Sequence, residues 1–218
     1  LVWLSAILIS TVPWILKGDY NFTQAAFEMT SGYSTTGLSV VDVDHTPKIF
    51  LLFRSITLFV GGVGLVLIIT SAFSDRYGLN LYNAEGHNDR LMPNLAKSAR
   101  VILTFYSAYI LIGTLAYILS GMPVFDAINT AIAALSTGGF SVIGESIYGY
   151  HSLQIEIITI VLMLLGQTNF TLHLYLFRRK WKNVFSHCET RFFLITAVIF
   201  ITGIPERMPE AFDVRAFQ

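Results

Sequence analysis

The sequence of 218 residues has little charge: only 13% of its residues are Asp, Glu, Lys or Arg, while 54% are hydrophobic. Soluble domains carry about 25% charged residues, so this composition argues against an ordinary soluble domain. The single cysteine, Cys188, excludes an internal disulfide. The formal net charge of zero supplies no bulk field that would attract nucleic acid, so we expect no nucleic-acid partner.

Charge is also absent from long stretches of the chain. Val101 to Phe125 holds 25 residues without a charge, Ser55 to Ser74 holds 20, and Ile157 to Phe177 holds 21. A helix needs roughly 20 apolar residues to cross the hydrocarbon core of a bilayer. Two shorter apolar stretches, Leu1 to Leu16 and Phe192 to Pro205, are interpreted as further spans, the first as the remaining end of a spanning helix. The chain is therefore predicted to be an all-α integral membrane protein in contact with the lipid bilayer.

The basic residues are segregated. Nine of the 14 Lys and Arg residues lie in or beside two loops, 74–100 and 178–191. By the positive-inside tendency these loops are predicted to be cytoplasmic. The opposite side carries acidic residues that would raise the local cation concentration at a pore mouth: Asp19, Glu28, Asp42, Asp44, Asp126 and Glu145.

An internal repeat organises the chain. When the sequence is shifted by 102 residues, the segment 34–40 (STTGLSV) falls on the segment 136–142 (STGGFSV), with five of seven positions identical. Each copy is predicted to consist of a span, a moderately apolar stretch of about 13 residues, the Ser/Thr/Gly segment and a second span. The second span is expected at Ile49 to Phe73 in the first copy and at Leu153 to Phe177 in the second. Such internal duplication is common in transport proteins.

The moderately apolar stretches, Asn21 to Tyr33 and Pro123 to Leu135, are too short to span. A helix of this length extends about 20 Å, whereas the hydrocarbon core is about 30 Å thick. We therefore predict re-entrant half-helices, each followed by irregular backbone. Such backbone is tolerated at membrane depth only where it lines a polar cavity or is buried in protein. Gly37 and Gly139 permit conformations forbidden to other residues, and rings of backbone carbonyls can replace the hydration shell of potassium.

The motifs resemble those of the Trk/Ktr/HKT potassium-transporter superfamily, and most closely those of the Trk membrane subunit. Residues 27–39 (FEMTSGYSTTGLS) are similar to the first pore loop of that family, and residues 54–64 (RSITLFVGGVG) to the helix that follows it. Residues 166–173 (GQTNFTLH) are similar to the end of the second unit, with Gln167 where a second Gly is expected.

The family resemblance implies a fold of four helix–pore helix–filter–helix units, of which this chain holds two and the start of a third. The implied regions are a first unit at 1–73, a cytoplasmic linker at 74–97, a second unit at 98–177, and a loop with the start of a third unit at 178–218. The resemblance also implies a homodimer of complete subunits, a cytosolic nucleotide-binding regulatory subunit and a place in the plasma membrane. It implies potassium as the transported ion, with no cofactor in this chain.

The expected filter consists of the backbone carbonyls of two segments, with the side chains facing the pore helices. These residues are Thr35, Thr36, Gly37 and Leu38 in the first segment and Thr137, Gly138, Gly139 and Phe140 in the second. A glycine at position 37 favours potassium, because plant relatives with Ser there are associated with sodium permeation. Arg54 is interpreted as half of a structural ion pair, with Glu28 as its partner.

Alternative interpretations remain open at this point. A sodium-permeable transporter of the same fold or a non-conducting membrane scaffold would share the same pattern. An intramembrane hydrolase would need a base near Ser34 or Ser136, and no His or Lys is paired with either in the repeat. No catalytic residue is predicted. The five histidines show no spacing typical of metal ligands, so no transition-metal site is predicted either.

Overall fold

The computed structural model describes residues 2–64, 95–168, 172–173 and 196 of the chain. The chain divides into two compact regions, Leu1–Gln167 and Thr168–Gln218. The second region lies almost entirely outside the described residues. Within the described part every regular element is helical, as expected for the predicted fold class.

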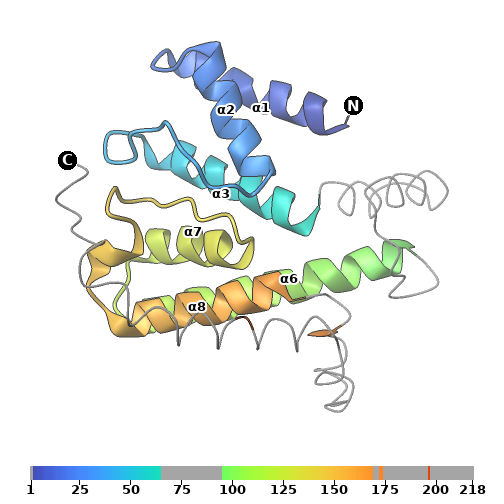
Figure 1. The fold of residues 1–218 in the computed structure, drawn as a ribbon, viewed down its shortest axis with the longest axis vertical. Coiled ribbons are helices and arrows are strands. Elements are labelled where there is room, and N and C mark those ends of the chain that lie inside the picture. The colour runs from blue at the N-terminus through green and yellow to red at the C-terminus, as the bar shows by residue number, and fades with distance from the viewer. Residues whose placement is uncertain (1, 65–94, 169–171, 174–195, 197–218) are drawn as a thin grey trace. The chain divides into compact units, whose positions relative to one another are not determined.

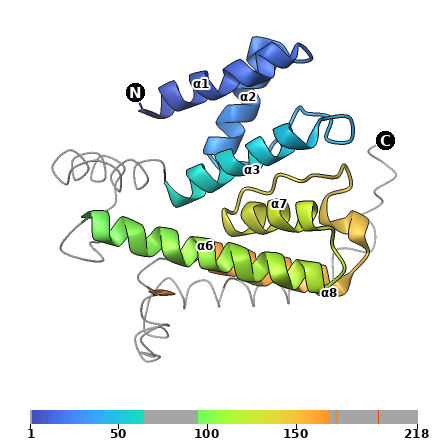
Figure 2. The same ribbon diagram turned by 180° about the vertical axis from the view of Figure 1, so that it is seen from behind.

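Seven helical elements make up the described part of the chain (Figures 1 and 2). They are α1 (Val2–Lys17), α2 (Phe22–Tyr33), α3 (Lys48–Val63), α6 (Leu95–Leu119), α7 (Val124–Leu135), the 3-10 helix η1 (Ser146–Tyr150) and α8 (Leu153–Gln167). In both views α6 and α8 lie side by side, with α7 beside them.

The two short helices predicted from the sequence are confirmed. Helices α2 and α7 each contain 12 residues, and each begins one residue after the predicted start. The start of α2 is stabilised locally, because the backbone N–H of Asn21 donates to the Gln24 side chain at 3.0 Å. Pro123 precedes α7, and Asp126 in its first turn complements the positive end of the helix dipole.

The long spans are confirmed in part. Helix α6 contains a stretch, Val101–Leu119, that is long and apolar enough to cross a membrane; in the described residues it is the one helix that meets that test. Helices α1 and α8 are shorter apolar helices. Helix α6 begins at Leu95, so Lys97 and Arg100, expected in the basic loop, lie in its first turns.

The second span of the first unit was predicted as Ile49 to Phe73. Helix α3 starts there but ends at Val63, where Gly64 follows with a φ of 87° and a ψ of 114°, outside helical geometry. Helix α8 likewise ends at Gln167 instead of continuing unbroken to Phe177, since Thr168 forms a bend. The remaining predicted spans and most of both basic loops lie outside the described residues.

The two units differ by a short insertion between the predicted filter segment, residues 35–38 or 137–140, and the second span. Helices α2 and α7 are separated by 102 residues, but Leu153 follows Lys48 by 105. The chain between pore helix and second span is therefore three residues longer in the second unit, which contains η1. Equivalent residues of α3 and α8 are therefore 105 positions apart.

Two glycines support this register. A Cβ added to Gly61 of α3 would meet the backbone of Tyr33, and one added to Gly166 of α8 would meet the backbone of Leu135. Tyr33 and Leu135 are the last residues of α2 and α7. Each second span therefore approaches the end of its pore helix closely through a residue without a side chain.

Each unit buries its own apolar cluster. Trp14, Ala25 and Met29 form the cluster of the first unit. The second unit buries a larger one: Tyr117, Met122, Ala127, Ala131, Ala134, Ile155 and Leu162. A third cluster, Leu58, Ala133 and Phe140, joins α3 of the first unit to the pore helix and filter segment of the second. This joint brings the two filter segments together.

Candidate ion-binding site

The chain leaves both half-helices through the same hydrogen-bonded turn. The N–H of Thr35 donates to the Gly32 carbonyl at 3.1 Å, and that of Thr137 donates to the Ala134 carbonyl at 3.2 Å. One residue later the pattern repeats: Thr36 donates to Ser31 at 2.9 Å, and Gly138 donates to Ala133 at 3.1 Å. Each of these hydrogen bonds in the first unit has a counterpart 102 residues later, so the repeat extends to individual backbone hydrogen bonds.

The backbone of both segments alternates in the sign of φ. Thr35 and Gly37 have φ values of 52° and 78°, and Thr137 and Gly139 have values of 55° and 84°. The intervening residues are not among those with positive φ. Alternation between left-handed and right-handed backbone can turn successive carbonyls towards one side, whereas in a β-strand they point alternately to opposite sides.

Positive φ at threonine is a strained conformation. It is a genuine outlier for a β-branched residue, and such strain persists where the surrounding structure imposes it, often at functional sites. Thr35 and Thr137 both adopt it at equivalent positions. The sequence offered no signal for this feature, because Thr does not favour a left-handed conformation.

The two segments lie against each other. A Cβ added to Gly37 would overlap the carbonyl oxygen of Gly138, and it would lie 3.4 Å from the carbonyl carbon of Gly139. All eight predicted filter residues therefore belong to two adjacent stretches of backbone. Both stretches follow the C-terminal ends of half-helices, where the helix dipole places partial negative charge.

The two segments differ in the burial of their last residue. Leu38 is 61% exposed, while Phe140, its equivalent in the second segment, is 4% exposed and packs with Leu58 and Ala133. The difference has a structural cause. The second segment has α3 of the first unit beside it, whereas no described element covers Leu38.

A buried ion pair lies beside the filter segments. Arg54 Nε is 2.7 Å from Glu28 Oε1, and the two side chains are 2% and 1% exposed. This pair was predicted from the sequence and is confirmed. Glu28 also accepts hydrogen bonds from Ser39 Oγ at 2.9 Å and from the N–H of Val40 at 3.1 Å. It therefore anchors the chain directly after the first filter segment.

A polar contact between the units was not predicted. Ser55 of α3 donates a hydrogen bond to the side-chain carbonyl of Asn129 in α7, at 2.5 Å. The Asn129 amide in turn donates to the Phe125 carbonyl at 2.7 Å, and its side chain is fully buried. An Asn within an apolar half-helix was the available signal, since a buried amide needs partners.

Two acidic side chains, Asp42 and Asp126, are held by neighbours. A hydrogen bond from His45 to Asp42, at 2.8 Å, lowers the pKa of the exposed Asp42 carboxyl. In the second unit, Tyr150 donates to Asp126 at 2.9 Å. Burial, followed by this contact with a carboxylate, raises the pKa of Tyr150.

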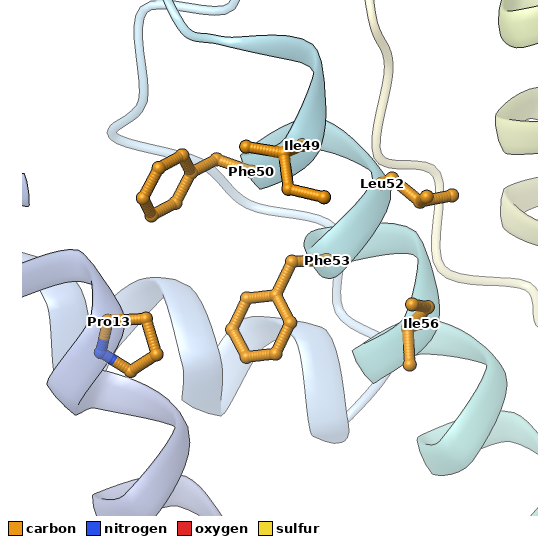
Figure 3. Close-up of a pocket in the computed structure, with 6 residues that line it drawn as sticks. All are labelled: Pro13, Ile49, Phe50, Leu52, Phe53 and Ile56. Atoms are coloured by element: carbon orange, nitrogen blue, oxygen red, sulfur yellow. The ribbon is translucent and has the colours of Figure 1, made fainter.

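A pocket between α1 and α3 is a poor candidate for ion binding. It is lined by Pro13 of α1 and by five residues of α3: Ile49, Phe50, Leu52, Phe53 and Ile56 (Figure 3). All six side chains are apolar, so they supply no ligand to a cation. The two predicted filter segments, which lie against each other, remain the better candidate.

Comparison with known families decides the affiliation of the chain. The profile of the family described as TrkH, cation transport protein, matches residues 2–204. The chain belongs to the TrkH family.

Two curated relatives match this TrkH family chain over most of its length. It is 34% identical over 213 residues to the Trk system potassium uptake protein TrkG of Escherichia coli, covering 92% of this chain and 44% of the relative. It is 31% identical over 215 residues to an uncharacterised cation transporter of Methanocaldococcus jannaschii, covering 96% and 44%. The chain thus spans less than half the length of these relatives.

A solved structure resembles this TrkH family member throughout the fold. The crystal structure of the potassium transporter TrkH from Vibrio parahaemolyticus matches with a TM-score of 0.78 and 27% identity. The match covers 92% of this chain and 42% of the solved chain. The predicted membership of the Trk group and the predicted all-α integral membrane fold are confirmed.

Proposed function

We propose that this TrkH family chain forms part of a potassium-uptake transporter in which backbone carbonyls select the ion. One observation supports this most: two segments related by 102 residues share the same turn, the same alternation of φ and a direct mutual contact. A backbone of this kind supplies a dehydrated monovalent cation with several neutral oxygen ligands. The curated and structural relatives that carry potassium in their names favour this ion over others.

The filter in this proposal consists of the eight residues predicted from the sequence. Thr35, Thr36, Gly37 and Leu38 contribute one part, and Thr137, Gly138, Gly139 and Phe140 the other. The half-helix dipoles of α2 and α7 add negative potential at the same place. Transported potassium is the only ligand that this mechanism needs, and no cofactor takes part.

The arrangement in the cell is also a proposal. Loops 74–100 and 178–191 face the cytoplasm of a plasma-membrane protein, and the acidic loops face outward. Regions 1–73 and 98–177 act as two units of a ring, joined by the linker 74–97 and followed at 178–218 by the start of another unit. Complete subunits pair as homodimers and carry a cytosolic nucleotide-binding regulator on the basic side.

The rival functions find less support. A hydrolase is disfavoured because the hydroxyl of Ser136 donates to the carbonyl of Ile132 at 2.7 Å, as a structural serine does. The hydroxyl groups of Ser34 and Thr36 form a hydrogen bond with each other at 2.7 Å. A scaffold would not require strained backbone at Thr35 and Thr137, since such strain is costly without a functional return. A sodium-permeable transporter differs only in selectivity, so measurement must decide.

The test is ion uptake by the full-length gene product. It should restore growth of a potassium-uptake-deficient bacterium on limiting potassium. After reconstitution into liposomes it should transport potassium faster than sodium. Equal sodium and potassium rates would support the sodium-permeable alternative, and absence of any flux from a well-folded, membrane-inserted protein would contradict the proposal.

A further inference from the structure

Arg54 touches more of the filter region than an ordinary structural ion pair requires. It lies in the second turn of α3, and its side chain is 2% exposed. Besides the contact with Glu28, its Nη2 donates to Ser39 Oγ at 2.9 Å. Its Nη1 donates to the carbonyl of Ser141 at 3.4 Å. The guanidinium carbon also lies 4.1 Å from the centre of the Phe140 ring.

The partners of Arg54 occupy equivalent places in the two units. Ser39 and Ser141 are separated by the repeat spacing of 102 residues, and each directly follows its filter segment. One guanidinium group therefore holds the outer ends of both segments. Arginine suits this role because its donors form a rigid planar fork with fixed directions.

The second unit has no equivalent charge pair. By the spacing of the pore helices, Glu28 corresponds to Thr130, and by the spacing of the second spans, Arg54 corresponds to Thr159. Thr159 bonds instead to Tyr117, at 2.7 Å. A buried ion pair is weak evidence for stability, because desolvation of the charges offsets their attraction. Its presence in one unit only therefore calls for a role beyond stability.

We propose that Arg54 is a positioning residue for ion selection, which sets the separation between the two filter segments. Discrimination between potassium and sodium depends on the size of the cavity and on the field of its carbonyls. Arg54 acts on both properties. It links Ser39 to Ser141, which fixes the size of the cavity. It also binds the Ser141 carbonyl, so that the row of carbonyls facing the ion ends at Phe140. This inference rests on the proposed function, because it refines the selectivity of the same filter.

The decisive variant is Arg54→Lys in the full-length gene product. A lysine keeps a positive charge near Glu28 but cannot donate in two fixed directions to Ser39 and Ser141. We expect the protein to accumulate and insert normally, while the ratio of potassium to sodium uptake in liposomes falls about tenfold. A merely structural arginine would lower both rates together and leave their ratio unchanged.

Two further variants complete the test. Ser39→Ala leaves the Arg54–Glu28 pair whole and removes one tether, so the uptake ratio should fall by a smaller factor; it decides the matter if Arg54→Lys fails to accumulate. Thr159→Val is the matched control, since it alters a buried hydroxyl at the equivalent position without touching a filter segment. Its ratio should equal that of the wild type.

The outcomes separate this inference from the proposed function. If the wild-type protein carries no potassium, the proposed function itself fails. If the wild type is selective and both Arg54→Lys and Ser39→Ala retain its ratio, Arg54 has no positioning role. An equal loss of selectivity in Thr159→Val would also overturn the inference, because the effect would then reflect general loosening of the fold.

Discussion

The two pore-loop units share a backbone but stabilise it by different means. In the first unit, a buried pair of opposite charges, Glu28 and Arg54, holds the end of the filter segment. In the second, the equivalent positions are Thr130 and Thr159, and the buried contact is a neutral hydrogen bond to Tyr117. The comparison indicates that the backbone turn is the common requirement, while the side chains that brace it are free to differ.

The units also differ in how crowded their filter glycines are. Gly37 lies against the carbonyl of Gly138, whereas a Cβ on Gly139 would meet no described atom within 4 Å. The second spans differ in the same way, because one face of α3 is more buried than the corresponding face of α8. The α3 face that includes Leu51, Ser55 and Leu58 is buried, and the corresponding positions of α8, Glu156, Ile160 and Met163, are exposed.

The largest expected difference between the units concerns charge. Glu28→Ala leaves the Arg54 guanidinium buried without its counter-charge, which should destabilise the full-length gene product by about 3–5 kcal/mol. Thr130→Ala removes a neutral hydroxyl at the equivalent position and should cost about 1 kcal/mol. Thermal unfolding of both purified variants in detergent measures the difference. Similar losses of stability in both variants would mean that the buried ion pair contributes no more to stability than the neutral hydroxyl does.

An intermediate difference is expected at the glycines. Gly37→Ala and Gly139→Ala each force a side chain into positive φ, at roughly 1–2 kcal/mol, and the first also pushes against Gly138. Potassium uptake should therefore fall about tenfold further in Gly37→Ala than in Gly139→Ala. If the two variants are equally impaired, the open side of Gly139 is occupied in the full-length protein by residues outside the described ones.

The smallest effect belongs to the neutral contact of the second unit. Thr159 donates to the Ile155 carbonyl at 2.8 Å, so Tyr117 donates to Thr159. Tyr117→Phe should reduce the free energy of unfolding by about 1 kcal/mol, without altering ion selectivity. A double-mutant cycle with Thr159→Val measures the coupling directly. A coupling near zero would indicate that packing, not this hydrogen bond, stabilises the second unit.

Much of the fold could be predicted because its signals are local. The half-helices α2 and α7 were predicted to within one residue at each end, since their apolar stretches are bounded by Asn21, Pro123 and the Ser/Thr/Gly segments. The Glu28–Arg54 pair was predictable because isolated charges in apolar helices need partners. The extents of α3 and α8 were not, because the break after Val63 interrupts a stretch that is apolar throughout.

The sequence by itself determined the membrane character, the repeat and the identity of the candidate filter residues, because hydrophobicity, length and spacing are properties of the chain alone. Only the tertiary structure decided that Thr35 and Thr137 adopt positive φ, that Leu38 is exposed while Phe140 is buried, and that Arg54 reaches Ser141. These features depend on which elements pack together, and contacts between residues 87 positions apart leave no trace in local composition.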